Sequence, residues 1–252
     1  MSKFDLLFLT SIMNAAGSLG FIPPKNHPDL PRLGAFITNP ISLKPRKHTR
    51  SPVAIPFSGG FLLHTGHPNP GFKNALRFYS EQWKRLDIPV IIHLLFDRPE
   101  DFGLMVGYLE SSGTVMAIEL GLPPNSGLEF LHGFARSVNS ELPMILRIPI
   151  DRTTALIETL AEPQIKDKFA AFSLGPPRGL LPDEPDRLVH GRLYGPALFP
   201  QALSALQILL ALDIPVIGGG AYSLKQAEIM VATGAVAVQV DAALWRGALP
   251  EG

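Results

Sequence analysis

The sequence contains no cysteine among its 252 residues. This absence excludes a disulfide framework, a thiolate metal site and a cysteine nucleophile, and it is compatible with the reducing cytoplasm, where we expect the protein to reside. Neither sign of charge is in excess, since 22 Lys and Arg balance 22 Asp and Glu. A surface built to bind nucleic acid would be strongly basic, so no nucleic-acid partner is expected. Apolar runs that reach the roughly 18 residues of a membrane span are also missing, so we expect no membrane association.

Short apolar runs and abundant turn residues are what the sequence does contain, with 23 Gly, 25 Pro and 46% hydrophobic residues. Val- and Ile-rich runs of this length are typical of strands buried on both faces of a parallel sheet. They are expected at 7–15, 35–43, 89–96, 115–122, 143–150, 169–175, 214–221 and 235–240. Helical segments are expected between them at 72–87, 99–111, 127–140, 151–162, 200–212 and 223–233.

Eight strands that alternate with helices in about 250 residues favour a closed (β/α)8 TIM barrel as the fold class. The competing interpretation is a six-stranded Rossmann-like sheet with additional hairpins. No composition shift marks a second domain, so residues 1–252 are expected to form one barrel. Two segments, 45–71 and 175–195, have no strand or helix pattern and are expected to be long loops at the face where barrel active sites lie.

The most specific local signal for a ligand is the triplet Gly218, Gly219 and Gly220, which ends a predicted strand. The helix that follows begins with Ser223-Leu-Lys-Gln226, which has the form of a capping box. In TIM barrels, the loops after the seventh and eighth strands commonly bind phosphate through backbone N–H groups and a helix N-terminus. A tight turn with close packing explains a glycine triplet equally well.

Titratable residues give weaker signals. His64 and His67 lie in the predicted loop after the second strand, where either could act as a base, although a solvated loop histidine is the commoner case. His93 lies inside a predicted strand and is expected to be a hydrogen-bonded core residue. Glu119 and Arg147 lie on neighbouring strands and are expected to form a structural ion pair. The histidines lack metal-ligand spacing with carboxylates, so no metal site is expected.

Seven segments, in order along nearly the whole chain, resemble the soluble class of dihydroorotate dehydrogenases, a family of FMN-binding TIM barrels. They are MNAAG at 13–17, GAFITNPISLKPR at 34–46, NPG at 69–71, IELGLPPN at 118–125, LYGPALFPQAL at 193–203, IPVIGGGA at 214–221 and AVAVQVDAAL at 235–244. The resemblance implies an FMN-dependent oxidoreductase acting on CH–CH bonds in pyrimidine biosynthesis. It implies FMN contacts from Ala15, Ala16, Gly17, Arg147, Ser173, Gly195, Gly218, Gly219, Gly220, Asp241 and Ala242. It leaves Asn69 and Asn125 as substrate-binding residues.

The chain departs from the family pattern where the chemistry occurs. Pro123 stands at the position of the catalytic base, a Cys or Ser in the family, and it has no titratable group. Gly121 replaces a substrate-binding Asn, and Asn39 replaces a Lys beside the flavin. Asp241 replaces a Gly where a carboxylate would repel the FMN phosphate, and the same carboxylate could cap the helix instead. Oxidation of dihydroorotate by this chain is therefore not expected to be efficient.

Three hypotheses follow from these observations. The first is an FMN-binding oxidoreductase related to dihydroorotate dehydrogenase, with a small-molecule substrate. The second is a catalytically inactive barrel that acts as a structural or assembly subunit, in a homo-oligomer or with a partner chain. The third is an enzyme that uses the same phosphate site for another phosphorylated metabolite.

Overall fold

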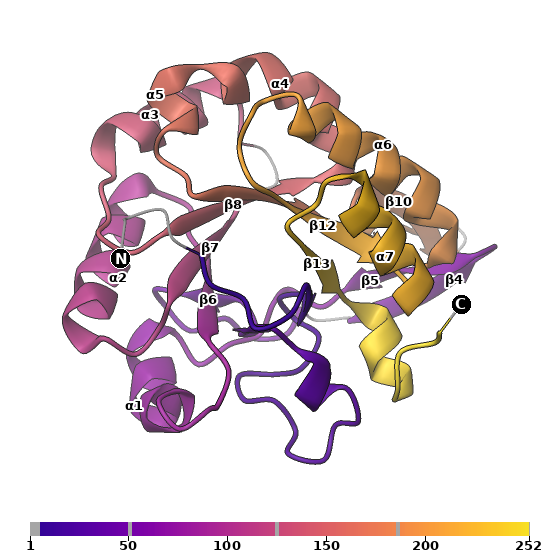
Figure 1. Ribbon diagram of the computed structural model, residues 1–252, viewed down its shortest axis with the longest axis horizontal. Coiled ribbons are helices and arrows are strands. Elements are labelled where there is room, and N and C mark those ends of the chain that lie inside the picture. Colours follow the sequence, from indigo (N-terminus) through magenta and orange to yellow (C-terminus); the bar gives the residue numbers. More distant parts are fainter. Residues whose placement is uncertain (1–5, 50–51, 124–125, 185–186, 252) are drawn as a thin grey trace.

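A computed structural model describes residues 6–49, 52–123, 126–184 and 187–251 of the chain. Parallel strands surround a central axis, and helices lie outside them (Figure 1). Neighbouring strands follow the order β1-β13-β12-β9-β8-β7-β6-β2, and β3 also pairs with β6. This arrangement confirms the predicted (β/α)8 barrel.

The barrel strands agree with the predicted runs, except that the second run is divided into two short strands. They are β1 (Ile12–Asn14), β2 (Phe36–Ile37), β3 (Ile41–Ser42), β6 (Val90–Leu95), β7 (Ala117–Gly121), β8 (Met144–Pro149), β9 (Ala171–Gly175), β12 (Val216–Ala221) and β13 (Ala237–Val240). The helices are α1 (Phe72–Trp83), α2 (Pro99–Ser112), α3 (Leu128–Ser137), α4 (Thr153–Ala161), α5 (Pro163–Lys166), α6 (Phe199–Leu210) and α7 (Leu224–Thr233). Short 3-10 turns are η1 (Leu30–Arg32), η2 (Ile150–Arg152), η3 (Pro196–Leu198) and η4 (Ala242–Arg246).

A side chain helps to close the barrel between β1 and β2. The Asn14 amide nitrogen donates to the Ile37 carbonyl at 2.7 Å, and its oxygen accepts from the Ile37 N–H at 2.8 Å. The amide group therefore replaces the backbone pairing that two longer strands would make.

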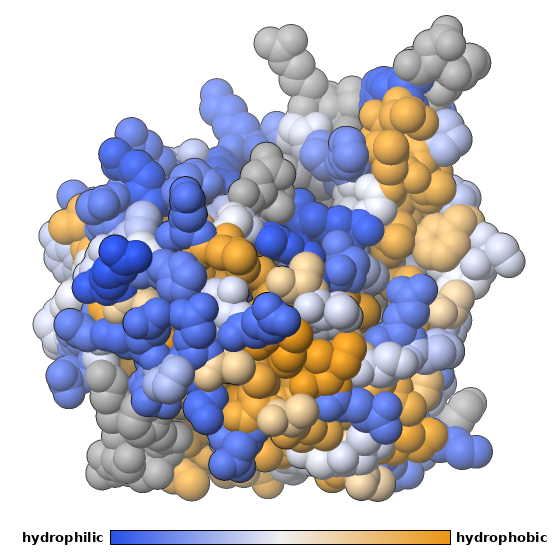
Figure 2. Space-filling view, turned by 90° about the horizontal axis from the view of Figure 1, so that it is seen from above, coloured by the Kyte–Doolittle hydropathy of each residue, from blue (hydrophilic) through white to orange (hydrophobic). Residues whose placement is uncertain are grey.

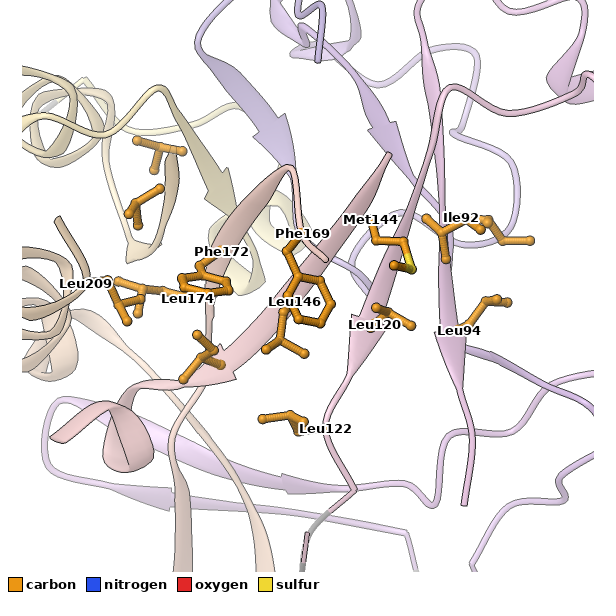
Figure 3. Packing of buried hydrophobic residues seen from close by; sticks show 14 of the residues in the cluster. Ile92, Leu94, Leu120, Leu122, Met144, Leu146, Phe169, Phe172, Leu174 and Leu209 are labelled. Carbon is orange, nitrogen blue, oxygen red and sulfur yellow. The ribbon is translucent and has the colours of Figure 1, made fainter. Parts of the chain in front are cut away.

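Two apolar layers hold the barrel together. Inside it, the N-terminal halves of the strands contribute Met13, Ala35, Ile37, Ile91, Ala117, Ile145, Ala171, Ile217 and Ala237, all fully buried. Outside it, larger side chains fill the space between strands and helices, and Figure 3 shows Ile92, Leu120, Leu146 and Phe172 among them. The interior layer closes one end of the barrel, so any site inside must open at the other end.

The two segments expected to be long loops instead supply a four-stranded antiparallel sheet. Its strands are β4 (Val53–Phe57), β5 (Gly60–His64), β10 (Arg178–Glu184) and β11 (Arg187–Tyr194), in the order β10-β11-β5-β4. The loop prediction was wrong because it took proline as a sign against strands. Pro56 and Pro182 lie on the two edge strands, where a missing backbone donor is tolerated.

None of the helices in the described ranges is long and apolar enough to cross a membrane. Their surfaces are mixed, and Figure 2 shows one face on which hydrophilic side chains surround apolar patches.

Candidate functional site

A layer of polar side chains lies inside the barrel, next to the interior apolar layer and nearer the carboxyl ends of the strands. Glu119 on β7 is at its centre and accepts hydrogen bonds from His93 Nδ1 at 2.6 Å, from Ser173 Oγ at 2.8 Å and from Gln239 Nε2. Arg147 Nη1 lies 3.6 Å from Glu119 Oε2. The expected core histidine and the expected ion pair are therefore both confirmed, and they belong to one cluster.

The charges in this cluster are fixed by its contacts. Burial alone would raise the pKa of the Glu119 carboxyl, but Arg147, His93 and Gln239 outweigh it and lower that pKa to about 2. Burial lowers the pKa of His93, although Glu119 opposes this shift. A carboxylate can only accept hydrogen bonds, so the neutral imidazole carries its proton on Nδ1 and its lone pair on Nε2.

Several polar atoms of the cluster remain without a hydrogen-bond partner among the described residues. They are His93 Nε2, Arg147 Nε, Arg147 Nη1 and Gln239 Oε1, and all are buried. Two glycines make room for these side chains. A Cβ at Gly121 would lie 2.8 Å from His93 Nε2, and a Cβ at Gly175 would lie 3.0 Å from Arg147 Nε. Gly121, which stands where the family has an asparagine, is thus required by His93.

A cavity of about 560 Å³ opens between this end of the barrel and the antiparallel sheet. It is lined by Arg46, Leu63, His64, Thr65, Gly66, His67, Leu95, Phe96, Asp97, Gly121, Leu122, Pro123, Arg178, His190, Gly191, Arg192 and Tyr194. The candidate bases His64 and His67 and the substituted position Pro123 therefore face one space. Sequence reasoning missed Arg178 and Arg192, because the segments 178–184 and 187–194 alternate too weakly to be predicted as strands.

The residues expected to bind substrate are not brought together at this cavity. Asn69 is buried, and its side-chain oxygen accepts from the Gly71 N–H at 3.0 Å while its amide nitrogen donates to the His67 carbonyl at 3.0 Å. It also exchanges hydrogen bonds with Ser42, so its amide organises the loop before α1. Asn125 lies outside the described residues.

The residues expected to bind FMN fall into three groups. Ala15, Ala16 and Gly17 follow β1, beside Asp241 and Ala242 at the end of β13, and Gly218–Gly220 lie on the adjacent β12. Arg147 and Ser173 belong to the polar cluster. Gly195 packs on the β4–β5 turn, where a Cβ would lie 2.3 Å from the Gly59 carbonyl oxygen.

The first turn of α7 is capped by the chain itself. Ser223 Oγ accepts from the Gln226 N–H at 3.3 Å, and Gln226 Oε1 accepts from the Tyr222 N–H at 2.7 Å. The predicted capping box is present, but glutamine reaches one residue further back than the motif requires. These amides are not free for a ligand.

The remaining amides of this turn are bound by the C-terminal segment. The Leu224 N–H donates to the Pro250 carbonyl at 2.8 Å, and the Lys225 N–H donates to the Glu251 carbonyl at 3.0 Å. Backbone donors at a helix N-terminus are what a phosphate would need, and here carbonyl oxygens use them.

Asp241 closes the other half of the expected phosphate site. Its Oδ1 accepts from the Ala242 N–H at 2.5 Å, as expected for a capping carboxylate. The hollow that it shares with Gly220, Tyr222 and Tyr194 has a volume of only about 10 Å³. That is about enough for one water molecule. The residues at the ends of β12 and β13 therefore do not fit the FMN phosphate that the resemblance places there.

Replacing Asp241 by asparagine is expected to stabilise the protein at neutral pH. Burial raises the pKa of the Asp241 carboxyl from 3.8 to about 6. A raised carboxyl pKa means that stability is lost as pH rises from about 4 to about 6, because the buried group must ionise. Asparagine keeps the acceptor for the Ala242 N–H without ionising. Urea unfolding should show Asp241→Asn to be more stable than the parent protein by on the order of 1–3 kcal/mol at pH 8.

The same comparison at pH 3 should show a much smaller difference, because the Asp241 carboxyl is then mostly protonated in both the folded and the unfolded state. Asp87→Asn, at an exposed position, serves as the control and should change stability little at either pH. An Asp241→Asn protein less stable than the parent at pH 8 would contradict the assignment of an ionisation penalty.

No protein-family model matches the chain. Curated relatives do match over most of its length, and they are described as catalytic subunits of dihydroorotate dehydrogenase B (NAD(+)). The protein from Desulforudis audaxviator is 28% identical over 92% of this chain and 82% of its own length. The protein from Pyrococcus furiosus is 26% identical over 96% and 86%, and that from a Geobacter strain is 29% identical over 92% and 82%.

A solved structure from Streptomyces coelicolor, described as a chitinase A, matches with a TM-score of 0.50 at 9% identity. It covers 94% of this chain and 92% of its own, and at this identity it supports the barrel fold alone. The order of the matching segments, the barrel and the relatives agree, and the chain is a divergent, dihydroorotate-dehydrogenase-like (β/α)8 barrel.

Proposed function

We propose that this chain is a flavin-free and catalytically inactive relative of dihydroorotate dehydrogenase B that acts as a structural or assembly subunit, with residues 1–252 as one domain. The observation that carries the proposal is the closed phosphate site. Asp241 caps η4, and the carbonyls of Pro250 and Glu251 bind the first amides of α7. A dianionic phosphate would have to displace these contacts and lie beside a buried carboxylate, which costs binding energy.

Two further observations support the same proposal. Pro123 lines the cavity where the resemblance requires a base, and proline cannot take a proton. The relatives are described as subunits, so proteins of this kind assemble with other chains. A chain that lost the reaction could keep such an assembly role.

The second candidate is an FMN-dependent oxidoreductase of pyrimidine biosynthesis. Arg147 favours it, because its Nε and Nη1 are buried without a hydrogen-bond partner among the described residues. The resemblance places the N1/O2 edge of the flavin near this residue, where a positive charge would stabilise the reduced ring. A bound FMN would then need the phosphate site to open.

The visible spectrum of the purified protein separates the two candidates. The flavin-free proposal predicts a colourless protein that retains no FMN after incubation and gel filtration. Asp241→Gly, which restores the glycine of the family pattern, should be incubated in parallel to test whether this carboxylate alone blocks uptake. A stoichiometric partner that purifies with the colourless chain would support the subunit role. A yellow protein that releases FMN on denaturation would overturn the proposal in favour of the second candidate.

A further inference from the structure

The antiparallel sheet places two arginines side by side on the wall of the 560 Å³ cavity. Arg178 on β10 is directly opposite Arg192 on β11 in the strand register, and both line the cavity. Directly opposed residues of an antiparallel pair have Cβ atoms about 5 Å apart, and like charges at this spacing destabilise the sheet. This pair is unfavourable unless something negative lies between or beside the two groups.

One carboxylate lies near Arg178: Asp151 attracts its guanidinium from beyond ion-pair distance, and Asp151 Oδ1 accepts from the Arg178 backbone N–H at 3.2 Å. Arg46, a third arginine of the cavity, is paired with Asp97 at 3.1 Å. Among the described residues, neither Arg178 nor Arg192 has a carboxylate within ion-pair distance, and the side-chain hydrogen bond of Arg192 goes to Tyr194. Two forked cations therefore face the cavity with donors to spare.

A neighbouring histidine is kept neutral in this cavity. His67 lines the same cavity, and its pKa is lowered to about 2, mainly by burial and further by the positive charges of Arg192, Arg46 and Arg178. The histidine is therefore neutral at physiological pH and adds no charge. The positive potential in the cavity therefore comes from the arginines. The neutral imidazole of His67 can still form a hydrogen bond with a bound group.

Other residues of the lining are suited to the body of a small organic molecule. Leu95 and Leu122 contribute apolar side chains to the lining, and Gly121 lines the cavity without a side chain of its own. A volume of about 560 Å³ is in the range of small-molecule sites, which typically combine apolar walls with a few convergent polar groups.

We propose that Arg178 and Arg192 form an anion-binding site for the carboxylate or phosphoryl group of a small metabolite whose body lies against Leu95, Leu122 and Gly121. A guanidinium group binds a carboxylate or a phosphoryl group in the same way, through two parallel N–H···O hydrogen bonds to two oxygens of the anion. The inference goes beyond the proposed function, because it concerns a different cavity from the closed phosphate site and holds with or without a flavin.

Calorimetric titration and thermal unfolding of the whole chain at low ionic strength test this site. The probes are inorganic phosphate and benzoate, with sodium chloride at matched ionic strength as the reference. Stronger binding of phosphate would indicate a phosphoryl ligand, and stronger binding of benzoate would indicate a carboxylate with an apolar body. We expect at least one probe to bind and to raise the Tm beyond the chloride reference.

The variants Arg178→Gln and Arg192→Gln are each expected to weaken that binding tenfold or more. Arg192→Lys keeps the positive charge but loses the forked pair of N–H donors. Its affinity for the probe should therefore lie between that of the parent and that of Arg192→Gln. Arg136→Gln, on the exposed face of α3, should bind as the parent does. Without ligand, the two glutamine variants should have a Tm equal to or above that of the parent, because one of two opposed charges is gone. This last measurement also shows that the variants fold.

Any of three results would overturn the proposal. The first is a parent protein that binds neither phosphate nor benzoate beyond the chloride reference. The second is folded Arg178→Gln and Arg192→Gln proteins that bind the probe as tightly as the parent. The third is an Arg136→Gln protein that loses binding to the same extent as these two variants.

Discussion

Replacement of Glu119 by alanine is expected to destabilise the folded protein by about 3–5 kcal/mol, the usual cost of removing one partner of a buried ion pair. The carboxylate is fully buried and holds Arg147, His93, Ser173 and Gln239. Without it, the Arg147 guanidinium stays buried with no negative charge beside it, and three hydrogen bonds are lost together. Effects of this size are exceptional for single substitutions and would identify Glu119 as the centre of the polar layer.

Urea unfolding at pH 7 measures this loss. Glu119→Gln keeps the shape and part of the hydrogen bonding, so it isolates the effect of removing the charge. Glu129→Ala, on the exposed face of α3, is the matched control and should change stability by less than about 0.5 kcal/mol. If Glu119→Ala were as stable as Glu129→Ala, the polar layer would not hold the barrel together.

The pH dependence of the parent protein provides a second measurement of the same group. The contacts of Glu119 lower its pKa from 4.5 to about 2. A depressed carboxyl pKa contributes stability that is complete above about pH 4.5 and is lost as pH falls towards 2. The parent should therefore lose stability more steeply than Glu119→Gln in this interval, and parallel curves would contradict the assignment.

The barrel was predictable because its signal is local and repeated. Each run such as 89–96 or 143–150 reports a strand buried on both faces, and the alternation with helices is enough to select the fold. His93 and the Glu119–Arg147 pair were also predictable, because charged residues inside buried strands need partners. That His93, Glu119 and Arg147 belong to one cluster depends on the register of the strands, which the apolar runs of the sequence do not specify.

The parts that sequence reasoning missed depend on contacts between distant segments. The antiparallel sheet pairs Phe61 with Tyr194, and neither segment alternates strongly enough to be recognised alone. The closing of the phosphate site likewise depends on where residues 250–251 lie relative to α7, which no local pattern reveals. Resemblance indicated which residues stand at the site, but only the packing shows that donors such as the Leu224 N–H are already used.

Replacement of Gly219 by alanine is expected to destabilise the protein by about 3 kcal/mol, at the upper end of typical overpacking costs. A Cβ at this position would lie 2.3 Å from the Leu174 carbonyl oxygen and 3.2 Å from its carbonyl carbon. These are backbone atoms of the neighbouring strand β9, so the clash is relieved only by separating β12 from β9. The glycine is therefore required by sheet packing, with no ligand involved.

Thermal and urea unfolding with and without added FMN distinguish packing from cofactor binding at Gly219. A packing role predicts the same loss of stability in both conditions, because the clash exists in the protein alone. Gly133→Ala, on α3 with no atom near its would-be Cβ, is the control and should stabilise the protein by up to about 1 kcal/mol. A Gly219→Ala protein as stable as the parent without FMN, but unable to gain stability from FMN that the parent gains, would assign the glycine to the flavin instead. That result would also overturn the flavin-free proposal, because it would mean that the parent binds FMN and needs Gly219 to do so.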